Sequence, residues 1–138
     1  MNAIVDTTVW SLAYRRPAHA LSPLERLYLQ VLKDLASDDR AQMLGVVRQE
    51  LLSGLRETAQ FERLRRTLAA FTDITVGAED HEEAARMFNT CRAKGITGGV
   101  VDFLICAASS RRGWAILTLD YDFELYSRHL PIKLVKVS

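Results

Sequence analysis

Cysteine and proline are scarce in this sequence. Its 138 residues include two cysteines, Cys91 and Cys106, and three prolines. The two cysteines form no C-x-x-C pair, so the sequence indicates neither a disulfide framework nor a zinc knuckle. We therefore expect thiols that stay reduced, which is typical of a cytoplasmic protein.

Long apolar stretches are also absent. The longest run without Lys, Arg, Asp or Glu is 8 residues, whereas a transmembrane helix needs about 20 apolar residues. The segment from Met1 to Asp6 has neither a basic region nor an apolar region of signal-peptide length. The sequence thus predicts no membrane span, no export signal and a cytoplasmic location.

Net charge is close to zero. The chain has 18 Lys and Arg against 17 Asp and Glu, which gives a formal charge of +1. This balance argues against a protein that holds nucleic acid through bulk positive charge. Because the length is ordinary for one domain and no repeat, low-complexity tract or linker divides the chain, we expect a single domain over residues 1–138.

Short apolar runs alternate along the chain with amphipathic helical patterns. The sequence from Ser22 to Glu25 predicts an N-cap, a proline in the first helical position and a capping box. Gly95 and Gly113 follow two further helical patterns, where glycine commonly ends a helix. Strands are expected at 3–5, 43–45, 71–76, 114–117 and 132–137, and helices from Ser22 to Asp38 and at 46–57, 61–71, 79–94 and 100–112.

Strands separated by helices favour right-handed crossovers and a mainly parallel central sheet with helices on both faces. We therefore predict a three-layer α/β/α domain.

Four carboxylates occupy places where such a sheet binds ligands. Asp6 and Asp120 directly follow predicted strands, at the edge where α/β sheets hold their ligands. Glu50 and Asp102 lie within otherwise apolar helical segments, and carboxylates are rarely buried unless they are paired or bind a metal. Four acids at one edge repel each other unless divalent cations neutralise them, and such hard oxygen ligands suit Mg²⁺ or Mn²⁺.

Each acid taken singly also has an ordinary structural interpretation. Asp6 is a favoured helix N-cap, and Asp102 suits the first turn of a helix. Asp120 is a common turn residue, and Glu50 would suit a solvated helix face. The combination, rather than any one residue, favours a metal site.

The segments that contain these acids resemble the PIN-domain ribonucleases, in particular the VapC-type toxins of bacterial toxin–antitoxin pairs. Four segments resemble family motifs, in the family's order and over nearly the whole chain: Asp6-Thr7-Thr8, Glu50-Leu51-Leu52-Ser53-Gly54, Lys94-Gly95-Ile96 with Val101–Ala108, and Ile116–Phe123. One departure is visible, because Gly45-Val46-Val47 stands where the family often has Ser or Thr.

This resemblance implies a PIN-like fold and a Mg²⁺- or Mn²⁺-dependent endoribonuclease that acts as the toxin of a toxin–antitoxin pair. By the same resemblance, Thr8 and Thr118 would orient carboxylates or a metal-bound water. Asp122 would support the site or cap a turn. The catalytic and metal-binding quartet would be Asp6, Glu50, Asp102 and Asp120.

Partners follow from the resemblance as well. It implies an RNA substrate, a cognate antitoxin and a homodimer. Arg15 and Arg16, after the first short helix, and Arg48, close to Glu50, are candidates for contacts with RNA phosphates, although solvated helix faces account for most arginines. The alternative function is a PIN-like RNA-binding or protein-interaction module without toxin activity.

Overall fold

A four-stranded parallel sheet forms the centre of the computed structural model, which describes residues 1–137. The strand order is β2-β1-β3-β4, and Ala3 of β1 lies opposite Ala41 of β2 and Ala115 of β3. Because all pairs are parallel, the carboxyl ends of the strands meet at one edge. The strands are β1 (Ala3–Val5), β2 (Ala41–Gln42), β3 (Ala115–Leu117) and β4 (Lys133–Leu134).

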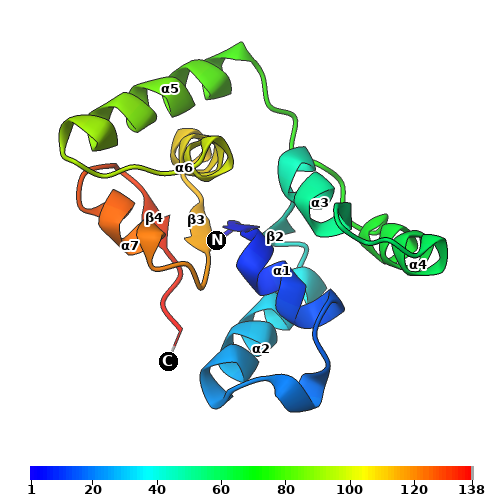
Figure 1. The fold of residues 1–138 in the computed structure, drawn as a ribbon. Helices are drawn as coiled ribbons and strands as arrows, with labels where there is room; N and C mark the ends of the chain where they lie inside the picture. Colours follow the sequence, from blue (N-terminus) through cyan, green and yellow to red (C-terminus); the bar gives the residue numbers. More distant parts are fainter. Residues whose placement is uncertain (138) are drawn as a thin grey trace.

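Helices cover both faces of this sheet. Helices α5 and α6 lie on one side, and α1 and α2 lie on the other (Figure 1), so the three-layer α/β/α prediction is confirmed. Within the described chain, no helix is both long and apolar enough to cross a membrane. The helices are α1 (Thr7–Tyr14), the 3₁₀ turn η1 (Ala18–Ala20), α2 (Pro23–Ser37), α3 (Gly45–Leu52), α4 (Thr58–Leu68), α5 (Ala78–Ala93), α6 (Val100–Arg112) and α7 (Asp122–Ser127).

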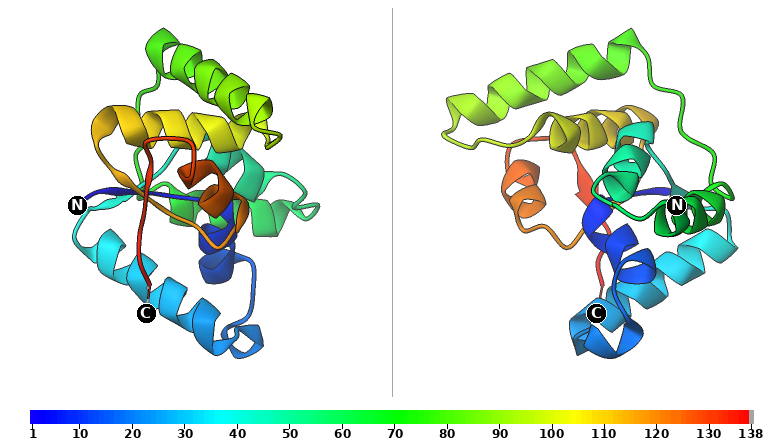
Figure 2. Two further views of the ribbon diagram at one scale, coloured as in Figure 1. Left: turned by 90° about the vertical axis from the view of Figure 1, so that its left-hand side faces the viewer. Right: turned by 45° about the vertical axis from the view of Figure 1, so that its right-hand side comes forward.

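Helix α6 is the most buried helix and packs between the sheet and α5, as the two further views show (Figure 2). Every residue from Phe103 to Ser109 is buried, so apolar side chains contact neighbours on all sides of this segment. This explains why the stretch Phe103–Ala108 is apolar on every side rather than amphipathic. The burial holds the first turn of α6, which carries Asp102, in a fixed place beside the sheet.

Helix α1 is tied directly to the central strand. The indole of Trp10 is completely buried, and its Nε1 donates a hydrogen bond of 3.0 Å to the carbonyl oxygen of Val5. A buried tryptophan usually finds such a partner, because an unpaired N–H in the core is costly. The bond fixes the start of α1, and with it Asp6, at the carboxyl end of β1.

The predicted helix signals are confirmed. Ser22 Oγ accepts a hydrogen bond from the Glu25 N–H, and Glu25 Oε1 accepts one from the Ser22 N–H, which completes the capping box of α2. Gly95, which follows the C-cap residue of α5, and Gly113, which directly follows α6, have φ values of 78° and 69°. These are left-handed conformations that side chains other than glycine rarely adopt.

The strand predicted at 71–76 is wrong. This segment forms only an isolated bridge between Met43 and Asp73. The carbonyl of Phe71 accepts a hydrogen bond from Arg48 instead of a neighbouring strand, and the Phe71 ring packs edge-on against Trp10 with a centroid distance of 4.8 Å. One backbone hydrogen bond, from the Ile74 N–H to the Met43 carbonyl, accompanies the bridge, and the other contacts named here involve side chains.

Several boundaries also differ from the prediction, and the last strand covers only Lys133–Leu134 rather than 132–137. The second strand lies at 41–42 rather than 43–45, and α3 ends at Leu52 rather than at 57. The chain turns away there through Gly54, whose φ is 86°. Helix α4 ends at Leu68 rather than at 71, and helix α7, which the periodicity did not indicate, follows Asp120.

Candidate metal centre

The carboxyl ends of β1 and β3 place Asp6 and Thr118 beside each other. Asp6 is 6% exposed, and its Oδ2 accepts hydrogen bonds from Thr8 Oγ1 at 2.8 Å and from Thr118 Oγ1 at 2.7 Å. Both donors use the same carboxylate oxygen. Oδ1 therefore keeps its acceptor capacity, since no donor within residues 1–137 binds it.

The same two threonines connect α1 to the loop after β3. Thr8 Oγ1 accepts a hydrogen bond of 3.1 Å from the Leu119 N–H, and Thr118 Oγ1 accepts one of 3.0 Å from the Asp120 N–H. Each hydroxyl thus donates to Asp6 and accepts from the loop that carries Asp120. This geometry matches the orienting role expected for Thr8 and Thr118, and that role stays a prediction.

Asp102, Asp120 and Asp122 converge at this edge from three different segments. One carboxylate oxygen from each lies within 4.8 Å of the other two. Asp102 belongs to the first turn of α6, Asp120 follows β3, and Asp122 is the first residue of α7. The Asp122 N–H donates a hydrogen bond of 2.9 Å to Asp120 Oδ1. Asp122, which the sequence assigned to support or to a turn cap, is therefore a member of the cluster.

Glu50 stands somewhat apart from these three acids. Its side chain is exposed, and its Oε1 accepts a hydrogen bond of 2.7 Å from Thr7 Oγ1. Thr7 and Thr8 are neighbours in the first turn of α1, so adjacent hydroxyls bind Glu50 and Asp6 respectively. Sequence reasoning did not assign a role to Thr7, although it lies within the motif that begins with Asp6. Membership of Glu50 in a metal-binding quartet stays a prediction.

Tyr126 is a second residue that sequence reasoning missed. Its ring is completely buried, and its hydroxyl donates a hydrogen bond of 2.7 Å to Asp102 Oδ2. A Cβ atom on Gly98 would lie 2.1 Å from this hydroxyl oxygen. Glycine at position 98 therefore gives Tyr126 the space to reach Asp102. The glycine-rich stretch before Asp102 was the available signal, but it did not reveal the partner.

Burial dominates the electrostatics of the cluster. It raises the pKa of Asp102 to about 6, and the negative charges of Asp6, Asp120 and Asp122 add to the increase, whereas the Tyr126 hydrogen bond opposes it. The Tyr126 hydroxyl stays protonated, because burial and its bond to Asp102 raise its pKa. Charged carboxylates this close together are therefore unfavourable without a cation.

The donor set fits a hard divalent ion. All groups in the cluster are carboxylates, and neither His nor Cys belongs to it. Oxygen ligands of this kind suit Mg²⁺ or Mn²⁺, whereas zinc sites usually include nitrogen or sulfur. The separation of 4.8 Å or less also allows one ion to contact all three residues, since oxygen–metal distances are about 2.0–2.6 Å.

The arginines expected near RNA have different surroundings. Arg15 ends α1 and is exposed, whereas Arg16 forms an ion pair with Glu25. Arg48 donates to Asp73 and to the carbonyl groups of Leu68 and Phe71. Arg48 thus connects α3 to the segment after α4, and contacts of these arginines with RNA stay predictions.

The departure from the family motif before Glu50 has a structural counterpart. The Oδ2 atom of Asp73 lies 3.2 Å from the position of a Cβ on Gly45, the first residue of α3. Asp73 also binds Arg48 one turn further along the helix. A carboxylate from a distant segment therefore lies near the positive end of α3, where a carboxylate is favourable.

Comparison with known proteins agrees with this architecture. The fold is similar to FitAcB from Neisseria gonorrhoeae, with a TM-score of 0.72, 15% identity and coverage of 97% of this chain and 96% of that chain. It is similar to VapBC2 from Rickettsia felis bound to a DNA fragment from their promoter, with a TM-score of 0.72, 17% identity and full coverage of both chains.

A third similar structure is VapBC-5 from Mycobacterium tuberculosis, with a TM-score of 0.70, 19% identity and coverage of 99% of this chain and 98% of that chain. No curated protein matches the sequence. The family model of the PIN domain matches residues 3–128, which include every acid described above. This chain therefore belongs to the PIN domain family.

Proposed function

We propose that this protein is a metal-dependent endoribonuclease that hydrolyses RNA phosphodiester bonds and acts as the toxin of a toxin–antitoxin pair. The observation that carries the proposal is the convergence of Asp102, Asp120 and Asp122 within 4.8 Å of one another, beside the buried Asp6. Membership in the PIN domain family supports the same reaction class. The donor set favours Mg²⁺, with Mn²⁺ as the alternative ion.

Asp102, Asp120 and Asp122 would hold the ion, and Asp6 and Glu50 would lie next to this metal site. When bound, such an ion neutralises charge on a scissile phosphate and lowers the pKa of water. The chain's own residues keep the carboxylates oriented. The hydrogen bonds from Thr8 and Thr118 hold the Asp6 carboxylate by its Oδ2 and leave its Oδ1 free. The Tyr126 hydroxyl holds the Asp102 carboxylate in the same way.

The toxin assignment rests on similar structures. The structure from Mycobacterium tuberculosis is described as a member of the VapBC family of toxin–antitoxin systems, and the fold match covers almost all of both chains. A structure from Klebsiella pneumoniae, with a TM-score of 0.60, is described as a toxin–antitoxin complex. The proposal therefore includes a cognate antitoxin. A homodimer and a cytoplasmic location are added to it as the expectations from the sequence.

Cleavage of an RNA panel tests the reaction directly. We expect internal cleavage of at least one structured or single-stranded RNA in Mg²⁺ or Mn²⁺. No cleavage is expected after EDTA removes the ions, because the site then lacks the cation that neutralises the negative charge of the phosphate. Mapping the 5′ ends of the products measures the cut positions, and a DNA panel tests for broader activity. Binding of RNA without cleavage in either ion would support the alternative, an RNA-binding or interaction module.

Thermal unfolding tests the metal site independently of any substrate. At a Mg²⁺ concentration about 100-fold above the dissociation constant, the ion should stabilise the fold by about 2.7 kcal/mol, which raises Tm by several degrees. We expect Asp122→Asn to reduce this gain by more than half. Glu124→Gln is the matched control, since it removes an exposed acid from the same turn of α7 and should keep the full gain. A Tm that does not change in millimolar Mg²⁺ would contradict the proposed metal site.

A further inference from the structure

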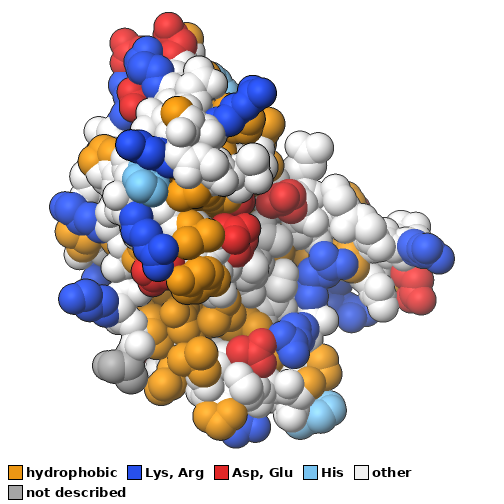
Figure 3. Space-filling model, turned by 60° about the vertical axis from the view of Figure 1, so that its left-hand side comes forward, with side chains coloured by type: hydrophobic (Ala, Val, Ile, Leu, Met, Phe, Trp, Pro, Cys, Tyr) orange, Lys and Arg blue, Asp and Glu red, His pale blue; other side chains and the backbone are white. Residues whose placement is uncertain are grey.

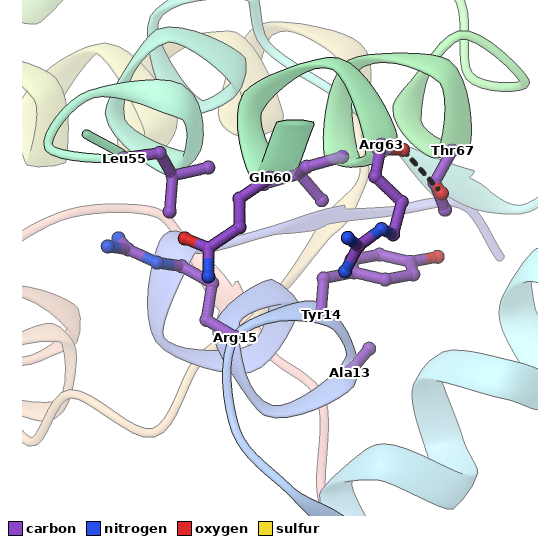
Figure 4. Close-up of a pocket in the computed structure, with 8 residues that line it drawn as sticks. Ala13, Tyr14, Arg15, Leu55, Gln60, Arg63 and Thr67 are labelled. Carbon is purple, nitrogen blue, oxygen red and sulfur yellow. Dashed lines mark hydrogen bonds between the residues drawn. The ribbon is translucent and has the colours of Figure 1, made fainter. Parts of the chain in front are cut away.

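A cavity of about 410 Å³ lies between the C-terminal end of α1 and helix α4. Tyr14 and Arg15 reach it from α1, and Gln60 and Arg63 reach it from α4. Figure 4 shows the side chains of Gln60 and Arg63 extending from their helix toward those of Tyr14 and Arg15. Two segments that are about 45 residues apart in the sequence thus each contribute an arginine to the lining of one cavity, and the Gln60 amide lies between the two arginine side chains (Figure 4).

The positive charges at this cavity have no partners in the described part of the chain. Within residues 1–137, the side chains of Arg15, Arg63 and Gln60 make no hydrogen bond, and no carboxylate lines the cavity. Two other arginines of these segments are paired, Arg16 with Glu25 and Arg65 with Glu62. Both side chains are exposed, so their guanidinium groups are available to an anion from outside the chain.

Helix α1 connects this cavity to the carboxylates. Asp6 caps the start of α1 and Arg15 caps its end, so nine residues at about 1.5 Å each place their backbones about 13 Å apart. The Trp10 hydrogen bond to Val5 holds the helix against the sheet, so this spacing is fixed. On one face of the surface, acidic side chains lie near the centre, and basic side chains lie on both sides of them (Figure 3). A single RNA strand covers such a distance with a few nucleotides.

We propose that this cavity binds a backbone phosphate of the RNA strand, a few nucleotides from the bond that the carboxylate site cleaves. The proposal rests on the nuclease function proposed above. Guanidinium groups suit phosphate because they offer paired N–H donors in one plane, and the Gln60 amide adds a further donor. The acidic cluster itself repels RNA in the absence of a cation, so strand binding needs a basic subsite at a distance from it.

Binding of an uncleaved RNA tests the subsite. The probe is a fluorescent single-stranded RNA of about 12 nucleotides, titrated into protein that carries Asp102→Asn, with anisotropy as the readout. Adding Arg15→Gln and Arg63→Gln should raise the dissociation constant about tenfold and lower the slope of log K against log salt by about 0.7 for each phosphate that the protein no longer neutralises. The matched control is Arg92→Gln, which removes an exposed arginine at the end of α5 and should change the constant less than twofold.

Three outcomes decide the proposal. Equal binding and equal salt slopes for the double variant and the Arg92→Gln control would overturn it. A second titration uses a glutamate-rich peptide as the probe. If the two substitutions weaken peptide binding and leave RNA binding unchanged, the cavity takes an acidic protein segment and the proposal fails. If RNA binding weakens as expected while wild-type protein cleaves no RNA, the subsite stands and the nuclease function fails, so the two failures can be told apart.

Discussion

Replacing Asp102 by asparagine is expected to lower RNA cleavage at least about 100-fold. Loss of a residue that merely orients a metal ligand typically costs about 10- to 100-fold in affinity or activity, and Asp102 is proposed to contact the ion itself. Asparagine keeps the shape of the side chain and can still accept the Tyr126 hydrogen bond. The measurement is the initial rate of RNA cleavage in Mg²⁺.

The same substitution is expected to stabilise the metal-free protein at neutral pH. The ordinary pKa of Asp102 is 3.8, and its environment raises it to about 6. The folded state therefore binds more protons than the unfolded state between these values, so stability falls as pH rises from about 4 to 6. At pH 7 the buried charge costs up to about 3 kcal/mol, and asparagine removes this cost together with most of the pH dependence.

Lower activity together with higher stability separates a missing metal ligand from a damaged fold. Urea unfolding in EDTA at pH 7 and at pH 4.5 measures the stability of both proteins, and Glu124→Gln is again the matched control. A metal-free Asp102→Asn protein that is less stable than wild type at pH 7 would contradict the electrostatic description of the cluster. RNA cleavage by the Asp102→Asn protein at the wild-type rate would contradict the proposed role of Asp102 as a metal ligand.

Replacing Asp80 by asparagine is expected to cause the largest loss of stability, about 3 kcal/mol. Asp80 lies in the first turn of α5, is 2% exposed and accepts hydrogen bonds from Arg111, Arg112 and the Gly77 N–H. The Arg112 side chain above all, with Gly77 and Arg111, holds the pKa of Asp80 well below its usual range. Asparagine would leave both guanidinium groups without their shared buried counter-charge.

Glu79→Gln provides a closely matched control for this prediction. Glu79 precedes Asp80 and also pairs with Arg111, but its side chain is 79% exposed. Solvent screens such a pair, so its loss should cost far less than the loss of the Asp80 carboxylate. Urea unfolding at pH 7 measures both changes. Equal losses of free energy for the two variants would show that burial of Asp80 does not matter.

Local signals in the sequence were sufficient for much of the fold. The capping box of Ser22 and Glu25 and the glycines after α5 and α6 depend on neighbouring residues, and all are confirmed. The apolar runs at Ala3–Val5 and Ala115–Leu117 form the two central strands. In contrast, the alternation at 71–76 formed only one isolated bridge, between Met43 and Asp73, and the Phe71 carbonyl accepts a hydrogen bond from Arg48 instead of from a strand.

The candidate site was predictable only in part. Asp6 and Asp120 could be placed because they follow strands, and strand ends meet at one edge of a parallel sheet. Asp122 joins the cluster because a short helix begins beside Asp120, and its start is set by the Asp122 N–H bond to Asp120. The pairing of Asp80 with Arg111 and Arg112 spans more than 30 residues, and no local pattern indicates which partners so distant a residue will meet.

The close approach of Gly98 to Tyr126 has a consequence for sequence variation. A Cβ at position 98 would meet both the hydroxyl oxygen of Tyr126 at 2.1 Å and its ring carbon Cζ at 2.8 Å. Even phenylalanine at position 126 would leave too little room, so a side chain at position 98 requires a smaller residue at 126 as well. Substitutions at the two positions should therefore be strongly non-additive, and during evolution the two positions should change together.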